Sequence, residues 1–100
     1  MVWGGCPQIT DVGVERIKEH TPLEQLDLSD TQITDAALEH IKLFPNLTFL
    51  DLTGTAVTDL GLKHLERLTN LGRLNLTGTN VTHAGIKELK AELPKVSVEE

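Results

Sequence analysis

The sequence predicts an α/β fold in which short strands alternate with short helices along a right-handed solenoid. The main observation is a repeat of 24 residues, with one copy at residues 23–46, a second at 47–70 and a third that begins at residue 71. In each copy the apolar residues first alternate with polar ones and then recur three to four apart, which predicts a strand followed by a helix. Such units bury their apolar faces by stacking. We therefore predict a single domain over residues 1–100 with about three full repeats.

Each copy begins with a strand whose leucines point into the core. In the second copy Leu50 and Leu52 alternate with Phe49, Asp51 and Thr53, so the two leucines are expected inside and the other three outside. A tight turn follows the strand.

Threonines recur at the end of this turn and, three residues later, at the expected helix start. We expect the first set to bond backbone groups of the turn: Thr31, Thr55 and Thr79. The second set are candidate N-caps, each followed by one residue of the first helical turn: Thr34-Asp35, Thr58-Asp59 and Thr82-His83. In the first two copies this residue is an acid that complements the helix dipole, and in the last it is a histidine.

The helices present one apolar face to the strands. Apolar residues three apart define this face: Leu38 and Ile41, Leu62 and Leu65, Ile86 and Leu89. Small residues precede them, which predicts close approach of one backbone to the next: Ala37, Gly61 and Gly85.

Both ends of the chain carry partial copies. Residues 8–14 align with residues 32–38, so a first helix is expected within a partial repeat over residues 1–22. A first strand with Trp3 turned inward is one register, and Val2 turned inward is the alternative. In the closing segment, residues 94–100, Val96 and Val98 are expected to form a last strand if one residue is inserted in the preceding helix.

Composition narrows the class of partner and the compartment. There are 15 acidic and 9 basic residues, for a net charge of −6, which disfavours nucleic acid and anionic membrane surfaces. The single cysteine, Cys6, excludes an internal disulfide, and neither an export signal nor a membrane-spanning run is visible. We therefore expect a cytoplasmic protein.

The residues resemble leucine-rich repeats. The pattern LxxLxLxxTxI/V followed by TDxGLxxL extends over about residues 1–98, and its TGTxVTDxGLxxL form is similar to a type found in many bacterial proteins. Residues 6–11 resemble the cysteine-containing repeats of F-box substrate receptors, although only one copy has the cysteine. The resemblance implies a parallel sheet on a concave face, helices on a convex face, and recognition of other macromolecules.

The outward strand positions form the candidate site. Alignment of the copies places these residues in two rows: Gln25, Phe49 and Arg73, then Asp27, Asp51 and Asn75. Adjacent aspartates suit a cationic partner or simply keep the sheet solvated. Phe49 is either an anchor for a partner or a local stack with Arg73.

These rows favour a non-catalytic interaction module that binds a protein or peptide, with some basic character, on the concave sheet. One alternative is a structural fragment of a longer array, which would self-associate through its N-terminal end; another is the substrate-recognition part of a ubiquitin-ligase-like receptor. An enzyme is not expected, because Cys6 has only His20 as a candidate base and His20 occupies a packing position. His40 and His64 lie at equivalent helix positions, yet two histidines fall short of a zinc site. No metal or cofactor is expected.

Overall fold

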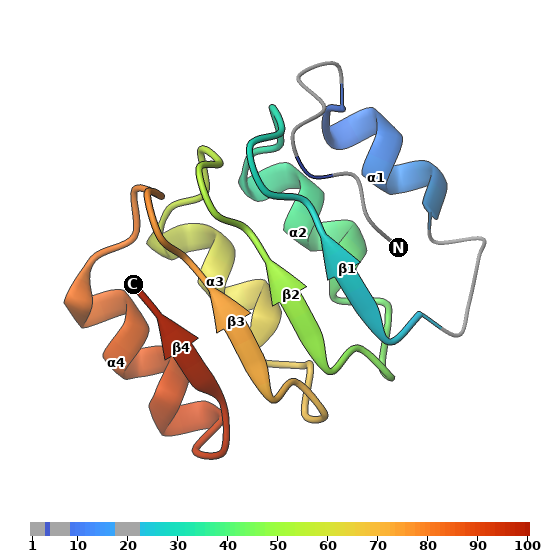
Figure 1. Cartoon of the computed structure of the whole chain (residues 1–100). Coiled ribbons are helices and arrows are strands. Elements are labelled where there is room, and N and C mark those ends of the chain that lie inside the picture. Colours follow the sequence, from blue (N-terminus) through green and yellow to red (C-terminus); the bar gives the residue numbers. More distant parts are fainter. Residues whose placement is uncertain (1–3, 5–8, 18–22) are drawn as a thin grey trace.

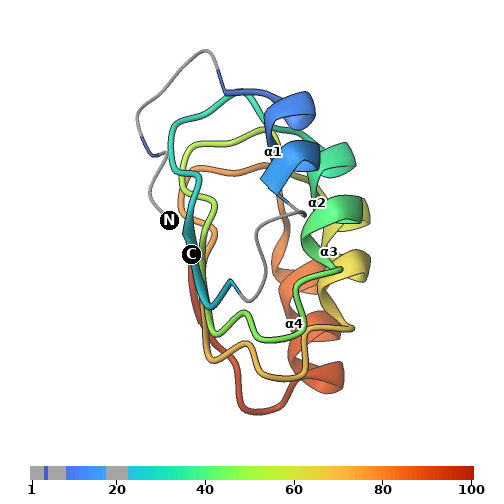
Figure 2. The same cartoon turned by 90° about the vertical axis from the view of Figure 1, so that its right-hand side faces the viewer.

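The computed structural model describes residue 4, residues 9–17 and residues 23–100. Strands and helices alternate along these residues: α1 (Asp11–Ile17), β1 (Gln25–Asp27), α2 (Asp35–Ile41), β2 (Phe49–Asp51), α3 (Asp59–Leu65), β3 (Arg73–Asn75), α4 (His83–Glu92) and β4 (Ser97–Glu99). The strands form one parallel sheet in chain order (Figure 1). All the helices lie on one side of this sheet (Figure 2), as the repeat pattern predicts.

The register of the sheet follows the 24-residue repeat. Leu26 pairs with Leu50, Leu50 with Leu74, and Leu74 with Val98. The three leucines are at most 1% exposed, and the helix residues predicted to face them are buried as well. Phe44, at 1% exposure, is the largest of the fully buried side chains among the described residues.

The turn after each strand is closed by its threonine, as expected. The Thr31 and Thr55 hydroxyls donate to the carbonyl oxygens of Leu28 and Leu52 at 2.7 and 2.8 Å. Gly54 and Gly78 have φ values of 72° and 73°, in the left-handed region that glycine adopts freely. Asp30 takes the equivalent place in the first copy with φ 55°, which aspartate tolerates better than most residues.

The threonine N-caps are confirmed, and they also join one repeat to the next. The Thr58 amide donates to Oδ1 of Asp35 at 2.7 Å, and the Thr58 hydroxyl donates to Oδ2 of the same carboxylate. The same hydroxyl accepts from the Leu60 amide at 3.3 Å, as an N-cap does. The first-turn acid therefore does more than complement its own helix: it binds the cap of the following helix, 23 residues away.

This bridge occurs three times, which makes it a ladder along the stack. Thr34 donates to Asp11 through both its amide and its hydroxyl at 2.7 Å. Thr82 donates to Asp59 in the same way at 2.8 and 2.6 Å. The hydroxyl and then the amide of Thr82 lower the pKa of Asp59 below its ordinary value, against the opposing effect of desolvation. Sequence reasoning missed the ladder, because a single repeat does not contain both partners.

The ladder also explains the buried glycines of the helices. A Cβ on Gly61 would collide with the Asp35 carboxylate and would lie 2.6 Å from Cδ1 of Leu38. A Cβ on Gly85 would collide with the Asp59 carboxylate. The expectation of a small residue was right, but its reason was wrong at these glycines: a carboxylate of the preceding repeat, rather than backbone, occupies the space.

The closing segment differs in one respect from the sequence prediction. The Val96 amide donates to the Leu93 carbonyl at 3.1 Å, as Leu71 donates to Leu68 at 3.0 Å, which agrees with the expected insertion. Val98 nevertheless pairs with Leu74, one 24-residue repeat earlier, because the segment from Val96 to Val98 is one residue shorter than the equivalent segment from Leu71 to Leu74. Val96 thus precedes β4 instead of belonging to it.

Some predictions lie outside the described residues. These are the first strand with Trp3 or Val2 inward, and the surroundings of Cys6 and His20. The N-terminal end invoked for self-association is in the same part of the chain.

Candidate functional site

The candidate site is the side of the sheet that faces away from the helices, which we call the sheet face. The parallel register places Gln25, Phe49, Arg73 and Ser97 in one row across the strands. The next row consists of Asp27, Asp51, Asn75 and Glu99. All six residues expected at the site are thus brought together. Ser97 and Glu99 were missed because the expected insertion displaced β4, although a constant 24-residue spacing would have found them.

The second row has a structural role in β1, β2 and β3. Asp51 Oδ1 accepts from the Thr53 amide at 3.0 Å and from the Thr53 hydroxyl at 2.6 Å. Asp27 Oδ1 accepts from Ser29 in the same way, at 2.9 and 2.7 Å. These side chains fix the backbone where each strand enters its turn. These bonds use Oδ1 of each aspartate, and the two carboxylates place negative charges side by side on β1 and β2.

Asn75 continues the row without a charge. Its Oδ1 accepts from the Thr77 amide at 3.1 Å and from the Thr77 hydroxyl at 2.8 Å, which is why an amide can replace the carboxylate. Its Nδ2 donates to Oε2 of Glu99 at 3.3 Å. The next negative charge of the row is therefore the carboxylate of Glu99 on β4.

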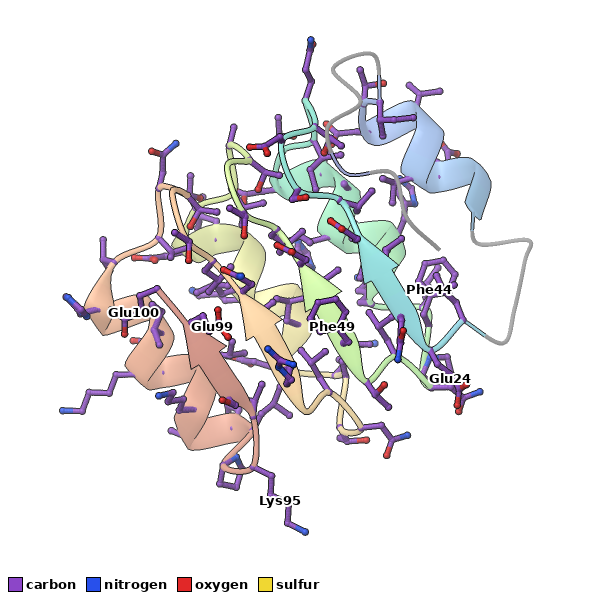
Figure 3. All side chains as sticks on the ribbon, viewed as in Figure 1. Glu24, Phe44, Phe49, Lys95, Glu99 and Glu100 are labelled. Atoms are coloured by element: carbon purple, nitrogen blue, oxygen red, sulfur yellow. The ribbon has the colours of Figure 1, made fainter. Side chains whose placement is uncertain are left out.

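Phe49 lies in the middle of the sheet face and is half-buried. The guanidinium carbon of Arg73 is 5.6 Å from the centre of its ring, within the range of a cation–π contact. Nη2 of Arg73 also lies 3.2 Å from Oε1 of Glu99. Figure 3 marks Phe49 and Glu99 on this side of the molecule. The stack of Phe49 with Arg73, one of the two alternatives raised by the sequence, is therefore present.

A hollow lies beside this stack. It has a volume of about 370 Å³ and is lined by Gln25, Thr48, Phe49 and Arg73. A second hollow, of about 260 Å³, lies between Leu71 and the turn from α4 to β4. The first is part of the sheet face and gives it a place for a side chain of a partner.

Other chemistries find little support among the described residues. His64 lies near Glu39, with Nε2 3.9 Å from Oε1, and no group of three or more His, Cys, Asp or Glu suited to a metal ion is found in the described part of the chain. None of the helices described is both long and apolar enough to cross a bilayer.

The geometry defines a class: an α/β repeat protein with a parallel sheet on one side and helices on the other. A family model described as leucine-rich repeats (two copies) matches residues 21–64. The model match, the 24-residue repeat and the structure together show that the chain has a leucine-rich repeat fold.

Two solved structures share the fold. A leucine-rich repeat protein of Leptospira interrogans has 20% sequence identity and a TM-score of 0.62, over 86% of this chain and 27% of that one. A chain in a structure of the Mex67:Mtr2 subunits of Chaetomium has 20% identity and a TM-score of 0.64, over 89% of this chain and 64% of that one. The chain therefore spans less than two thirds of either protein. No curated protein matches the sequence significantly.

Proposed function

We propose that the sheet face is a non-catalytic binding surface for a protein or an extended peptide with basic character. Leucine-rich repeat domains are typical protein–protein interaction modules, and the finer assignment depends on the side chains of this chain. The observation that carries it is Phe49, an aromatic ring on an otherwise polar face, at the edge of a hollow of about 370 Å³. Aromatic side chains in such places are preferred anchors of interfaces.

The charge of the sheet face supports the basic character of the partner. Asp27, Asp51 and Glu99 contribute three carboxylates, whereas Arg73 contributes one cation that already contacts Glu99. Neighbouring strands lie about 4.8 Å apart, so Asp27 and Asp51 repel each other. A cation from the partner would relieve this repulsion and would be attracted by the net charge of −6.

The experiment is a selection of peptides from a random library on the wild-type chain, followed by binding measurements with two variants. Phe49→Asp should weaken the selected peptides at least tenfold, because it removes the anchor. Leu60→Asp makes the same change at an apolar side chain that is 70% exposed on the opposite side of the molecule, and it should leave binding within twofold. Circular dichroism checks that both variants are folded. Equal effects of the two substitutions, or selected peptides without an excess of Lys and Arg, would count against the proposal.

A further inference from the structure

Arg73 already occupies the surface that a basic partner would use. Its guanidinium lies over Phe49, with Cζ 5.6 Å from the ring centre, and bonds Glu99 at 3.2 Å. An arginine that stacks on an aromatic ring and pairs with a carboxylate is the arrangement by which proteins commonly recognise arginine. The sheet face therefore already contains the kind of contact that an arginine of the proposed partner would make, namely a guanidinium on Phe49 next to a carboxylate.

We propose that Arg73 is an internal competitor, and that the partner inserts an arginine side chain which displaces it from Phe49. This inference depends on the proposed function, since it names the group that the sheet face recognises. Arginine is favoured over lysine because its planar guanidinium stacks on a ring and offers several donors to a carboxylate at the same time.

The internal contact is weak enough to be displaced. The side chains of Arg73 and Glu99 are 67% and 57% exposed, and one hydrogen bond of 3.2 Å joins them. Exposed ion pairs of this kind contribute little, because both groups are well solvated when apart. When Arg73 leaves the ring, its guanidinium can be solvated by water and still lie close to the exposed Glu99 carboxylate.

Asp51 is the carboxylate that the incoming arginine would bind. It lies two residues from Phe49 on the same strand, about 6.6 Å along it, and on the same face. Both of its hydrogen bonds use Oδ1, so Oδ2 has no partner among the described residues. Asp27 is less suitable, because a Cβ on Gly4 would lie 2.9 Å from its Oδ1, which shows how closely the chain approaches it there.

The test is an NMR titration of the ¹⁵N-labelled chain with a blocked seven-residue glycine–serine peptide that carries one central arginine. A second peptide has citrulline in place of the arginine, which keeps the shape and removes the charge. The arginine peptide should shift amides of β2 and β3, and the citrulline peptide should bind at least threefold more weakly. Asp51→Asn should weaken the arginine peptide at least threefold, because the incoming guanidinium loses its charged acceptor.

Arg73→Gln separates competition from simple charge. This substitution should raise the affinity for the arginine peptide about two- to fivefold, because no arginine then has to leave the Phe49 ring before the peptide binds. Arg67→Gln removes the same charge from an exposed position in the turn after α3, and it should change binding by less than twofold. Weaker binding to Arg73→Gln, or equal tightening by both variants, would overturn the inference while leaving the sheet face as the binding surface. If neither peptide shifts any strand amide, the inference fails, and the library selection with Phe49→Asp decides separately whether the proposed function fails as well.

Discussion

Substitution of Gly61 by Ala tests the ladder that joins the repeats. In an exposed helix this change stabilises by about 1 kcal/mol, because alanine has the higher helix propensity. Here the new Cβ would collide with the Asp35 carboxylate and with Leu38. Asp35 would have to shift relative to the amide and the hydroxyl of Thr58, which donate two hydrogen bonds to this charged group worth about 1.5–3 kcal/mol each. Ala37 takes the equivalent place in the first copy and leaves the bridge from Thr34 to Asp11 intact, so only part of this bonding should be lost, and we expect a net loss of about 1 kcal/mol.

The assay is thermal and urea unfolding followed by circular dichroism. A loss of about 1 kcal/mol should lower the melting temperature by about 4–8 °C in a domain of this size. Gly72→Ala is the matched control, because its Cβ would lie 3.7 Å from the nearest atom, the Thr48 carbonyl oxygen, which is an ordinary contact. That variant should be as stable as the wild type or slightly more stable.

A double-mutant cycle identifies the cause of the Gly61 effect. In an Asp35→Ala background the carboxylate is absent, so Gly61→Ala should cost at least about 0.5 kcal/mol less than in the wild type, as expected for residues in contact. Additive effects would show that the clash with Leu38 alone is responsible. A Gly61→Ala variant as stable as the wild type would refute the reasoning altogether.

Three further predictions concern stability. Hydrogen bonds from Thr82 lower the folded-state pKa of Asp59, so this group stabilises the fold above its unfolded pKa, and the contribution is lost as pH falls through the folded pKa. The difference in unfolding free energy between the wild type and Asp59→Ala, measured by urea unfolding, should therefore shrink from pH 6 to pH 3, and a constant difference would contradict this. Thr55→Val should cost about 1–2 kcal/mol in the same assay because it removes the buried bond to the Leu52 carbonyl, and a neutral result would show that the turn does not need it. Phe44→Ala should cost about 3–5 kcal/mol by leaving a cavity in the core, and a loss below 1 kcal/mol would mean that the core can collapse around the site.

The repeat made much of the local structure predictable from sequence. Alternating Leu50 and Leu52 defined a strand and its inner face, and Thr58 defined the start of α3, because these features depend on residues within one copy. The rows of the sheet face followed as well, since a constant spacing of 24 residues fixes which outward side chains are neighbours.

The tertiary structure decided the contacts between copies. The bond from Thr58 to Asp35 joins residues 23 apart, and the carboxylate that fills the space beside Gly61 belongs to the preceding repeat. The place of Glu99 beside Arg73 depended on a residue inserted near α4 and lost again before β4. Sequence periodicity specifies what each repeat must bury, because that is a property of one strand and one helix. Which polar atoms meet across the stack depends on side-chain reach and register, and these are fixed only when the repeats pack together.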